Sequence, residues 1–258
     1  MIQRLIPSSG ENLPVIGLGT WQTFDVDPNN SAAQKKVLEV LRSSGGTLVD
    51  SSPMYGNAEK VVGEITKDNP GYFIATKVWI KGKKSGISQM EDSFRKLKRA
   101  CIDLLQVHNL VDWEAHLETL NEWKKEGKIR YVGITHYTDG MQADLERIIN
   151  KVEIDFVQFN YSIDGRHAEK TLLPLAASRG VATLINRPFG EGRLFNKCRG
   201  KTLPAWAKEW DINSWGEFFL KFIVAHPAVT CVIPATSSHE HAQDNCKAGM
   251  GLLPDEKT

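Results

Sequence analysis

The chain has 258 residues, of which 41% are hydrophobic and 24% charged, so it is long enough to bury one full hydrophobic core. Lysine plus arginine number 32 and aspartate plus glutamate 31, and the net charge of +1 provides neither a basic stripe nor an acidic tail. From this balance we expect no nucleic-acid partner.

The N-terminal stretch lacks the apolar centre of a signal peptide, and no run reaches the ~18 apolar residues that a membrane span requires. We therefore predict a cytoplasmic protein with no membrane partner. The four cysteines, Cys101, Cys198, Cys231 and Cys246, form no CxxC pair, so we expect neither a disulfide framework nor a zinc site. We expect all four to be reduced thiols that are buried or half-buried.

Eight short apolar runs predict eight buried strands in chain order. They cover 15–19, 46–50, 72–77, 103–108, 130–134, 155–159, 181–185 and 230–234. Near-continuous apolar strands are typical of a parallel sheet that helices cover on its outer face. The intervening stretches predict helices over 31–44, 57–66, 87–100, 113–126, 139–150, 167–178, 214–226 and 238–247.

The helix predicted over 87–100 illustrates the pattern. Its apolar positions fall on one stripe at steps of three and four, namely Ile87, Met90, Phe94, Leu97 and Cys101. Strands alternating with such helices predict a single (β/α)8 TIM barrel over 1–258. An open doubly wound sheet needs a glycine fingerprint after its first strand, and Gln22 stands where its third glycine belongs.

The segment 186–213 is the one long insertion between a predicted strand and its helix. It is rich in glycine, proline and tryptophan and follows the seventh strand. Barrels place the loops after their strands at the catalytic mouth, so we expect this segment beside the active site.

Four ionisable side chains follow three successive predicted strands. Asp50 and Tyr55 come after the second strand, Lys77 after the third and His108 after the fourth. Because the C-terminal ends of barrel strands converge on one mouth, we expect these side chains to meet. Each residue alone has a structural explanation in a turn, a loop or the core, but the joint arrangement favours a catalytic site.

Tyr55 is the candidate proton donor. Tyrosine has an ordinary pKa of about 10, so a cation such as Lys77 is needed to stabilise its phenolate. A buried lysine in turn needs a carboxylate to stay charged, and Asp50 can supply it. With His108 orienting a substrate oxygen, the set suits proton donation to the alkoxide that forms when hydride reaches a carbonyl carbon. Since no side chain donates hydride, a cofactor must do so.

Segments along nearly the whole chain resemble the aldo-keto reductases. They are GLGTW at 17–21, GGTLVDSSPMYGNAEKVVGE at 45–64, ATKVW at 75–79, LLQVHN at 104–109, KKEGKIRYVGIT at 124–135, VQFNYS at 157–162, LLPLAASRGVATLINRPFGEGRL at 172–194 and CVIPATSSHEHAQDN at 231–245. The resemblance implies that Asp50, Tyr55, Lys77 and His108 form the catalytic tetrad. It implies reduction of aldehydes or ketones to alcohols, or the reverse, with NADP(H) and also NAD(H) as cofactors.

The resemblance also assigns cofactor contacts, with two departures from the family's pattern. Where the family has a Ser-Asn pair after strand five, this chain has Thr135 and His136, and where it has an aromatic residue after strand seven, this chain has Asn186. The implied set on this side of the cofactor is Thr20, Trp21, Thr135, His136, Gln158, Asn186, Arg187, Phe189 and Arg193. Gln158 also suits a purely structural role inside the barrel, and Arg187 suits a charge on its rim.

Family members that prefer NADP usually hold its 2′-phosphate with a lysine and an arginine, and the matching positions here are Ala235 and His241. Thr236, Ser237 and Asn245 keep groups suited to the adenosine half. We therefore expect use of both nucleotides with a modest preference for NADPH. Two alternatives stay open: His241 lies on a solvated helix face, or Arg187 or Arg193 holds the phosphate.

Three aromatic residues, Trp21, Trp79 and Tyr137, follow strands one, three and five and are candidates for the wall of an apolar substrate pocket; packing on the barrel rim is the alternative. The alternative function is a cofactor-binding, redox-sensing regulatory subunit without turnover, because one fold serves several functions. A metal-dependent barrel hydrolase needs ligands after strand one, whereas the HxH of His239 to His241 opens the last helix, so we expect no metal.

Overall fold

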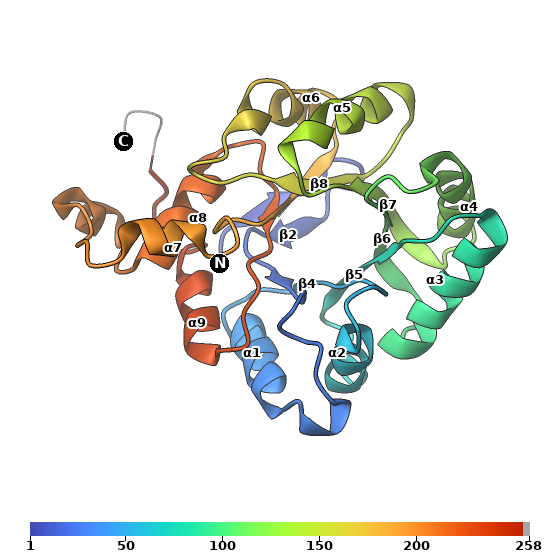
Figure 1. The fold of residues 1–258 in the computed structure, drawn as a ribbon, viewed down its shortest axis with the longest axis horizontal. Helices are drawn as coiled ribbons and strands as arrows, with labels where there is room; N and C mark the ends of the chain where they lie inside the picture. The colour runs from blue at the N-terminus through green and yellow to red at the C-terminus, as the bar shows by residue number, and fades with distance from the viewer. Residues whose placement is uncertain (255–258) are drawn as a thin grey trace.

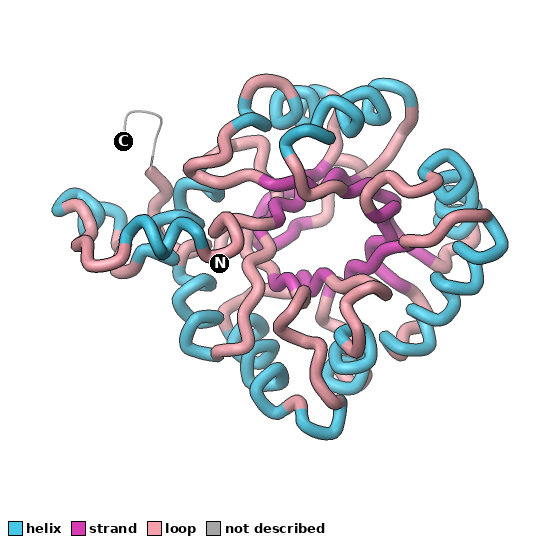
Figure 2. Tube along the Cα trace, in the orientation of Figure 1, coloured by secondary structure: helices cyan, strands magenta, loops and turns pink. Residues whose placement is uncertain are grey.

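The computed structural model describes residues 1–254, which form a barrel of eight parallel strands surrounded by helices (Figures 1 and 2). The barrel strands are β3 (Leu18–Gly19), β4 (Leu48–Asp50), β5 (Phe73–Val78), β6 (Ile102–His108), β7 (Ile129–Thr135), β8 (Phe156–Asn160), β9 (Ala182–Asn186) and β10 (Cys231–Val232). They lie in chain order from β3 to β10. The predicted (β/α)8 fold is confirmed.

The barrel closes through backbone hydrogen bonds between its first and last strands. The amide of Gly17 donates to the carbonyl of Val232 at 2.8 Å, and the amide of Gly19 donates to Pro234 at 3.1 Å. The amide of Val232 donates back to Val15 at 2.9 Å. These bonds satisfy the edges that an open sheet would leave unpaired.

The outer layer consists of α1 (Ala32–Ser43), α2 (Ala58–Thr66), α3 (Lys83–Leu97), α4 (Trp113–Lys125), α5 (Gln142–Lys151), α6 (Leu172–Ser178), α8 (Trp215–Ala225) and α9 (His239–Lys247). Their apolar stripes pack against the outward-facing strand residues and form the larger of two buried clusters. Short 3₁₀ turns, Asp139–Met141 and His167–Glu169, precede α5 and α6 where longer single helices were predicted. Among the described residues, no helix has the length and apolar character to cross a membrane.

The predicted stripe of α3 is correct at its centre and wrong at its end. Met90 and Leu97 are fully buried, and Ile87 and Phe94 pack against the core. The helix stops at Leu97 because Lys98 takes a left-handed conformation with φ 54°. Cys101 therefore lies outside the helix and is exposed, which contradicts the expectation that every cysteine is at least half-buried. Cys198 is half-buried, and Cys231 and Cys246 are buried as expected.

An N-terminal hairpin that the sequence pattern did not predict closes one end of the barrel. It consists of β1 (Gln3–Leu5) paired antiparallel with β2 (Asn12–Pro14), which lies across the barrel opening in Figure 1. Ile6 and Leu13 are buried together with Leu48 and Phe73, the first residues of β4 and β5. The hairpin therefore seals the N-terminal end and leaves the C-terminal end for the site.

The insertion 186–213 leaves the barrel at the C-terminal end of β9, as expected, and then turns outward (Figure 2). It carries α7 (Arg193–Cys198) and a 3₁₀ turn, Ala205–Trp210. Its aromatic side chains pack on α8: the ring centroids of Phe195 and Phe219 are 5.7 Å apart and those of Trp206 and Phe218 5.6 Å. Most of the insertion thus packs beside the barrel.

Candidate active site

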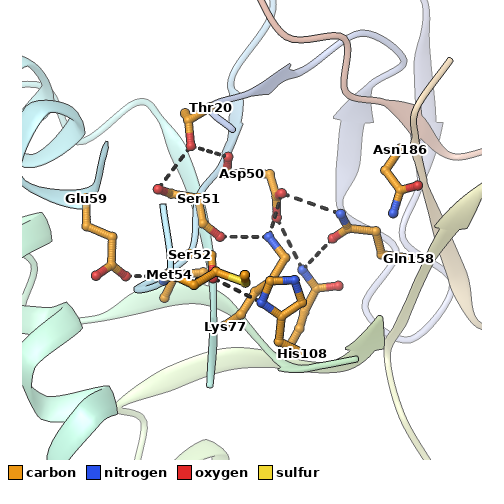
Figure 3. A network of polar contacts seen from close by, with 12 residues as sticks. Thr20, Asp50, Ser51, Ser52, Met54, Glu59, Lys77, His108, Gln158 and Asn186 are labelled. Carbon is orange, nitrogen blue, oxygen red and sulfur yellow. Dashed lines mark hydrogen bonds and ion pairs between the residues drawn. The ribbon is translucent and has the colours of Figure 1, made fainter. Parts of the chain in front are cut away.

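The four ionisable residues predicted to meet lie together at the C-terminal end of the barrel. Asp50 ends β4, Lys77 is the penultimate residue of β5 and His108 ends β6, and these three strands are neighbours in the sheet. Tyr55 follows in the loop between β4 and α2. Figure 3 shows Asp50, Lys77 and His108 pointing into one polar network.

Lys77 and Asp50 form a buried ion pair. The Lys77 Nζ lies 2.6 Å from Asp50 Oδ2 and also donates to the carbonyl of Ser51 at 2.7 Å. Their side chains are only 0% and 3% exposed. Burial alone would lower the pKa of Lys77, but the Asp50 carboxylate, with Tyr55, reverses the effect and raises it. Lys77 is therefore cationic at neutral pH.

Tyr55 lies against this cation and against His108. Lys77 Nζ is 5.2 Å from the centroid of the Tyr55 ring, and the His108 ring meets Tyr55 edge-on at 5.9 Å between centroids. Burial raises the pKa of Tyr55, and attraction to Lys77 opposes that rise only in part. The phenol therefore keeps its proton at neutral pH, beside a cation that favours its release to a substrate oxygen.

His108 is held as a neutral imidazole. Its Nδ1 is 3.1 Å from the Ser52 hydroxyl. Burial, followed by repulsion from Lys77 and His136, lowers the pKa of His108 to about 2. A neutral ring that accepts from Ser52 at Nδ1 carries its proton on Nε2, where it can donate a hydrogen bond.

Two buried glutamines form the floor of the site beneath the tetrad, and Gln106 is one that sequence reasoning missed. Gln106 Nε2 lies 3.3 Å from Asp50 Oδ1 and 2.9 Å from Gln158 Oε1. Gln158 Nε2 in turn lies 3.5 Å from Asp50 Oδ2. The sequence did contain a signal for Gln106. Every second residue of a strand faces the same side, and Gln106 stands two residues before His108 in LLQVH, so both face the barrel interior.

The residues assigned to the nicotinamide side are near this floor, but His136 has a structural task. Thr135 is buried and pairs with Gln158 in the sheet register. His136 Nδ1 accepts from the amides of Tyr137 and Thr138 at 3.0 and 3.3 Å, so the ring caps its own loop. Asn186 Nδ2 donates to the His136 carbonyl at 3.2 Å, which leaves Asn186 Oδ1 buried without a partner in the structure. An unpartnered buried acceptor fits a ligand that donates.

Other predicted cofactor residues have partners of their own. The Thr20 hydroxyl contacts the Asp50 carbonyl and the Ser51 hydroxyl, both at 3.0 Å. Arg193 forms ion pairs with Asp164, and Phe189 packs on Phe195 at 4.9 Å between centroids. Among the described residues, neither Arg193 nor Phe189 forms a hydrogen bond, ion pair or ring contact with the tetrad.

Arg187 lies on the rim of the mouth. Its guanidinium carbon is 4.2 Å from the centroid of the Tyr137 ring, and it pairs with Glu191 at 2.9 Å. Tyr137, Trp21 and Trp79 are 39%, 41% and 41% exposed, which is high for aromatic residues. Trp79 approaches the tetrad, with its ring centroid 6.4 Å from that of His108.

The residues assigned to the adenosine half lie in α9 and in the segment just before it. Ala235, Ser237 and His241 are exposed, whereas Thr236 and Asn245 are buried. Ser238 caps the helix by accepting from the His241 amide at 3.2 Å. Sequence reasoning missed Glu240, whose carboxylate lies in the first turn, 2.6 Å from the Ser238 hydroxyl. That hydroxyl holds the pKa of Glu240 below its usual range, so a negative charge stands at this helix start.

Comparison with known proteins agrees with this geometry. The family model described as "Aldo/keto reductase family" matches residues 15–258. Methylglyoxal reductase YeaE from Escherichia coli is 28% identical over 95% of this chain and 89% of its own length. The NADH-specific methylglyoxal reductase of the same organism is 27% identical over 81% of this chain and 73% of its own length.

A solved structure has the same fold. The aldo-keto reductase from Klebsiella pneumoniae in complex with NADPH superposes with a TM-score of 0.84 at 23% identity, covering 100% of this chain and 93% of that one. The family match, which extends over the whole barrel and includes all four tetrad positions, is the stronger finding. The chain therefore belongs to the aldo/keto reductase family of NAD(P)-dependent oxidoreductases.

Proposed function

We propose that this chain reduces aldehydes or ketones to alcohols with NADPH or NADH, and that Tyr55 is the general acid. The observation that carries the proposal is the chain of contacts from the half-buried Tyr55 to Lys77 and from Lys77 to Asp50, in which the Lys77–Asp50 pair is closed off from solvent and a neutral His108 flanks Tyr55. A tyrosine that keeps its proton beside a stabilising cation is suited to donate that proton to a developing alkoxide.

Each tetrad residue has a distinct task in the proposed reaction. The nicotinamide, when bound, supplies the hydride that the carbonyl carbon receives. Tyr55 donates its proton to the carbonyl oxygen, so that the product is a neutral alcohol and the phenolate later regains a proton from solvent. Lys77 stabilises that phenolate, and Asp50 keeps Lys77 charged. His108 donates a hydrogen bond from Nε2 to the same carbonyl oxygen and so orients it.

The residues around the floor suit a nicotinamide carboxamide. Gln158 and Thr135 present amide and hydroxyl groups at the ends of neighbouring strands, and Asn186 adds its unpartnered Oδ1. A primary carboxamide offers both N–H donors and a carbonyl acceptor, which this set can match. In this proposal Asn186 provides the side-chain amide function that His136 cannot, because the His136 ring caps its own loop.

Two features support a proposal for the substrate class: the aromatic residues at the C-terminal end of the barrel and the names of two similar proteins. Trp79 beside His108, together with Trp21 and Tyr137, provides apolar, aromatic surface above the tetrad. Two relatives bear the name methylglyoxal reductase, which makes a small 2-oxoaldehyde the natural first substrate to assay. We expect turnover of that compound and of aromatic aldehydes, because an aromatic wall selects weakly among apolar groups.

The test is the Tyr55→Phe variant, which removes the proton and keeps the ring. We expect kcat for aldehyde reduction to fall by about 10²- to 10⁴-fold while the dissociation constant for NADPH stays unchanged. Tyr72→Phe is the matched control, because that buried tyrosine donates to the Leu38 carbonyl away from the tetrad. Near-normal kcat in Tyr55→Phe would reject the role, and a wild-type protein that binds NADPH but reduces none of the aldehydes would favour the regulatory alternative.

A further inference from the structure

We propose that Gln106 is a positioning residue that fixes the orientation of the Gln158 amide for cofactor binding and supports the Asp50 carboxylate. The inference rests on the proposed binding of a nicotinamide cofactor at Gln158. It concerns a side chain beneath the tetrad that need not itself touch cofactor or substrate.

The sequence makes room for Gln106 inside the barrel. Gln106 is fully buried and lies between Lys77 and Gly133 in the sheet register. A Cβ on Gly133 would lie 3.0 Å from Gln106 Cγ and 2.9 Å from the Phe156 carbonyl. Glycine at 133 therefore lets the Gln106 side chain extend across the interior, from β6 toward β4 on one side and β8 on the other.

Burial raises the pKa of Asp50, but the Lys77 ammonium 2.6 Å away opposes that rise, and the carboxylate of this ion pair determines how both amides are turned. An ionised carboxylate only accepts hydrogen bonds, so each glutamine must present its NH₂ group to Asp50. Gln106 Nε2 faces Asp50 Oδ1 at 3.3 Å, and its second N–H reaches Gln158 Oε1 at 2.9 Å. Gln158 consequently accepts from Gln106 and directs its own Nε2 toward Asp50. The 2.9 Å bond is the shorter contact and holds Gln158 more firmly than the 3.5 Å one.

This arrangement leaves Gln158 with one N–H and one oxygen lone pair unused. Those are the two complementary groups that a primary carboxamide can pair with. Without Gln106, the Gln158 amide keeps only its longer contact of 3.5 Å with Asp50 and can rotate more freely. A mobile amide binds the same carboxamide less tightly because the restraint must then be supplied on binding.

Gln106 also has a buried polar atom without a hydrogen-bond partner in the described part of the chain, which is unfavourable for a residue with a purely structural role. Its Oε1 is buried and has no hydrogen-bond partner among residues 1–254. An unsatisfied buried acceptor destabilises the folded state, and an apolar side chain of similar shape at this position would avoid that cost. A residue that weakens the core while ordering the site points to function.

The experiment is a double-mutant cycle on cofactor binding. The variants are Gln106→Met, Gln158→Met and the double substitution, and the dissociation constants of NADPH and NADH are measured by quenching of tryptophan fluorescence. We expect Gln106→Met to weaken binding about 3- to 10-fold, the size of one neutral hydrogen bond. In the Gln158→Met background it should have no further effect on binding, because the amide that it positions is gone.

Thermal unfolding separates positioning from a general structural role. Gln106→Met removes the unpartnered oxygen but also the donor to Asp50 and Gln158, so its melting temperature should fall no further than that of Gln142→Met, which makes the same exchange elsewhere. Gln142→Met is the matched control: Gln142 is also fully buried, donates to the Asn160 carbonyl at 3.2 Å and has an unpartnered Oε1. It should leave both dissociation constants unchanged.

Additive effects of Gln106→Met and Gln158→Met on binding would overturn the inference, and so would unchanged binding in Gln106→Met. A Gln106→Met protein that loses binding only in proportion to a lower melting temperature would do the same. None of these measurements requires turnover. If Tyr55→Phe keeps near-normal kcat while the effects of Gln106→Met and Gln158→Met on binding are non-additive, only the proposed role of Tyr55 as the acid is contradicted. If Tyr55→Phe is inactive while the two effects on binding are additive, only the role of Gln106 is contradicted.

Discussion

The Lys77 ammonium lies 2.6 Å from Asp50 Oδ2, and the side chains of this pair are almost completely closed off from solvent. Asp50→Asn keeps the shape of the side chain and removes its charge. Breaking one partner of such a pair leaves an uncompensated buried cation, so we expect the free energy of unfolding to fall by about 3–5 kcal/mol. Urea denaturation at pH 7 measures it.

The double substitution Asp50→Asn with Lys77→Met is the control for that prediction. It removes the unpaired charge, so most of the lost stability should return, while kcat for aldehyde reduction should stay low. A double variant as unstable as Asp50→Asn would show that packing, and not charge, explains the loss.

The imidazole of His108 should make the protein less stable in acid. Burial lowers the pKa of His108 to about 2 in the folded state, whereas an unfolded chain has the ordinary value of about 6.5. Below pH 6.5 the unfolded state thus binds a proton that the folded state excludes. The stabilising contribution is complete above pH 6.5 and is lost as pH falls toward 2, by at most about 1.4 kcal/mol per pH unit.

The matched variant is His108→Asn, which cannot titrate. Urea denaturation from pH 7 to pH 4.5 should show a shallower loss of stability in the variant than in the wild-type protein. Parallel curves would mean that His108 is protonated in the folded state. His167→Asn, at an exposed position in a 3₁₀ turn, controls for removal of a histidine as such.

Lys221 should determine how firmly the insertion is held. It is almost completely buried in α8, and its Nζ donates to the carbonyls of Trp210, Met250 and Leu252 at 2.9, 3.1 and 2.8 Å. Lys221→Met leaves these three carbonyls without that donor, at a cost of about 2–4 kcal/mol.

Hydrogen exchange measures this effect locally. In Lys221→Met, amides of the 3₁₀ turn Ala205–Trp210 should exchange faster, while those of β5 and β6 should be unchanged. Lys208→Met, an exposed lysine in the same turn, is the control. Equal exchange in Lys221→Met and the wild-type protein would show that aromatic packing on α8 alone holds the insertion.

Glu240 should disfavour the 2′-phosphate of NADPH. Its ionised carboxylate stands in the first turn of α9, beside the residues that the family resemblance assigns to that phosphate. Glu240→Gln removes the repulsion, and we expect tighter NADPH binding by about two- to five-fold, with NADH binding unchanged.

Isothermal titration with both nucleotides at low and high salt measures this difference, which salt should reduce. Glu209→Gln, which removes an exposed carboxylate from the 3₁₀ turn of the insertion, is the control. An equal change for NADPH and NADH would place the 2′-phosphate elsewhere, with Arg187 the next candidate.

The sequence alone determined the barrel and its tetrad. Strand runs with apolar residues on both faces, separated by amphipathic helices, fit a parallel closed sheet, and the local order of residues fixes which side chains stand at the strand ends. Asp50, Lys77 and His108 could therefore be placed at one mouth before any contact was known, and the family model matches across these strands.

Only the tertiary structure decided what each side chain contacts. The ion pair of Lys77, the neutral state of His108 and the amide orientations of Gln106 and Gln158 depend on burial and on groups from several different strands. The N-terminal hairpin escaped prediction because its strands are short and its buried residues, Ile6 and Leu13, find partners only inside the assembled barrel. Hydrogen bonding and desolvation act over a few ångströms in space, and distance along the chain does not report them.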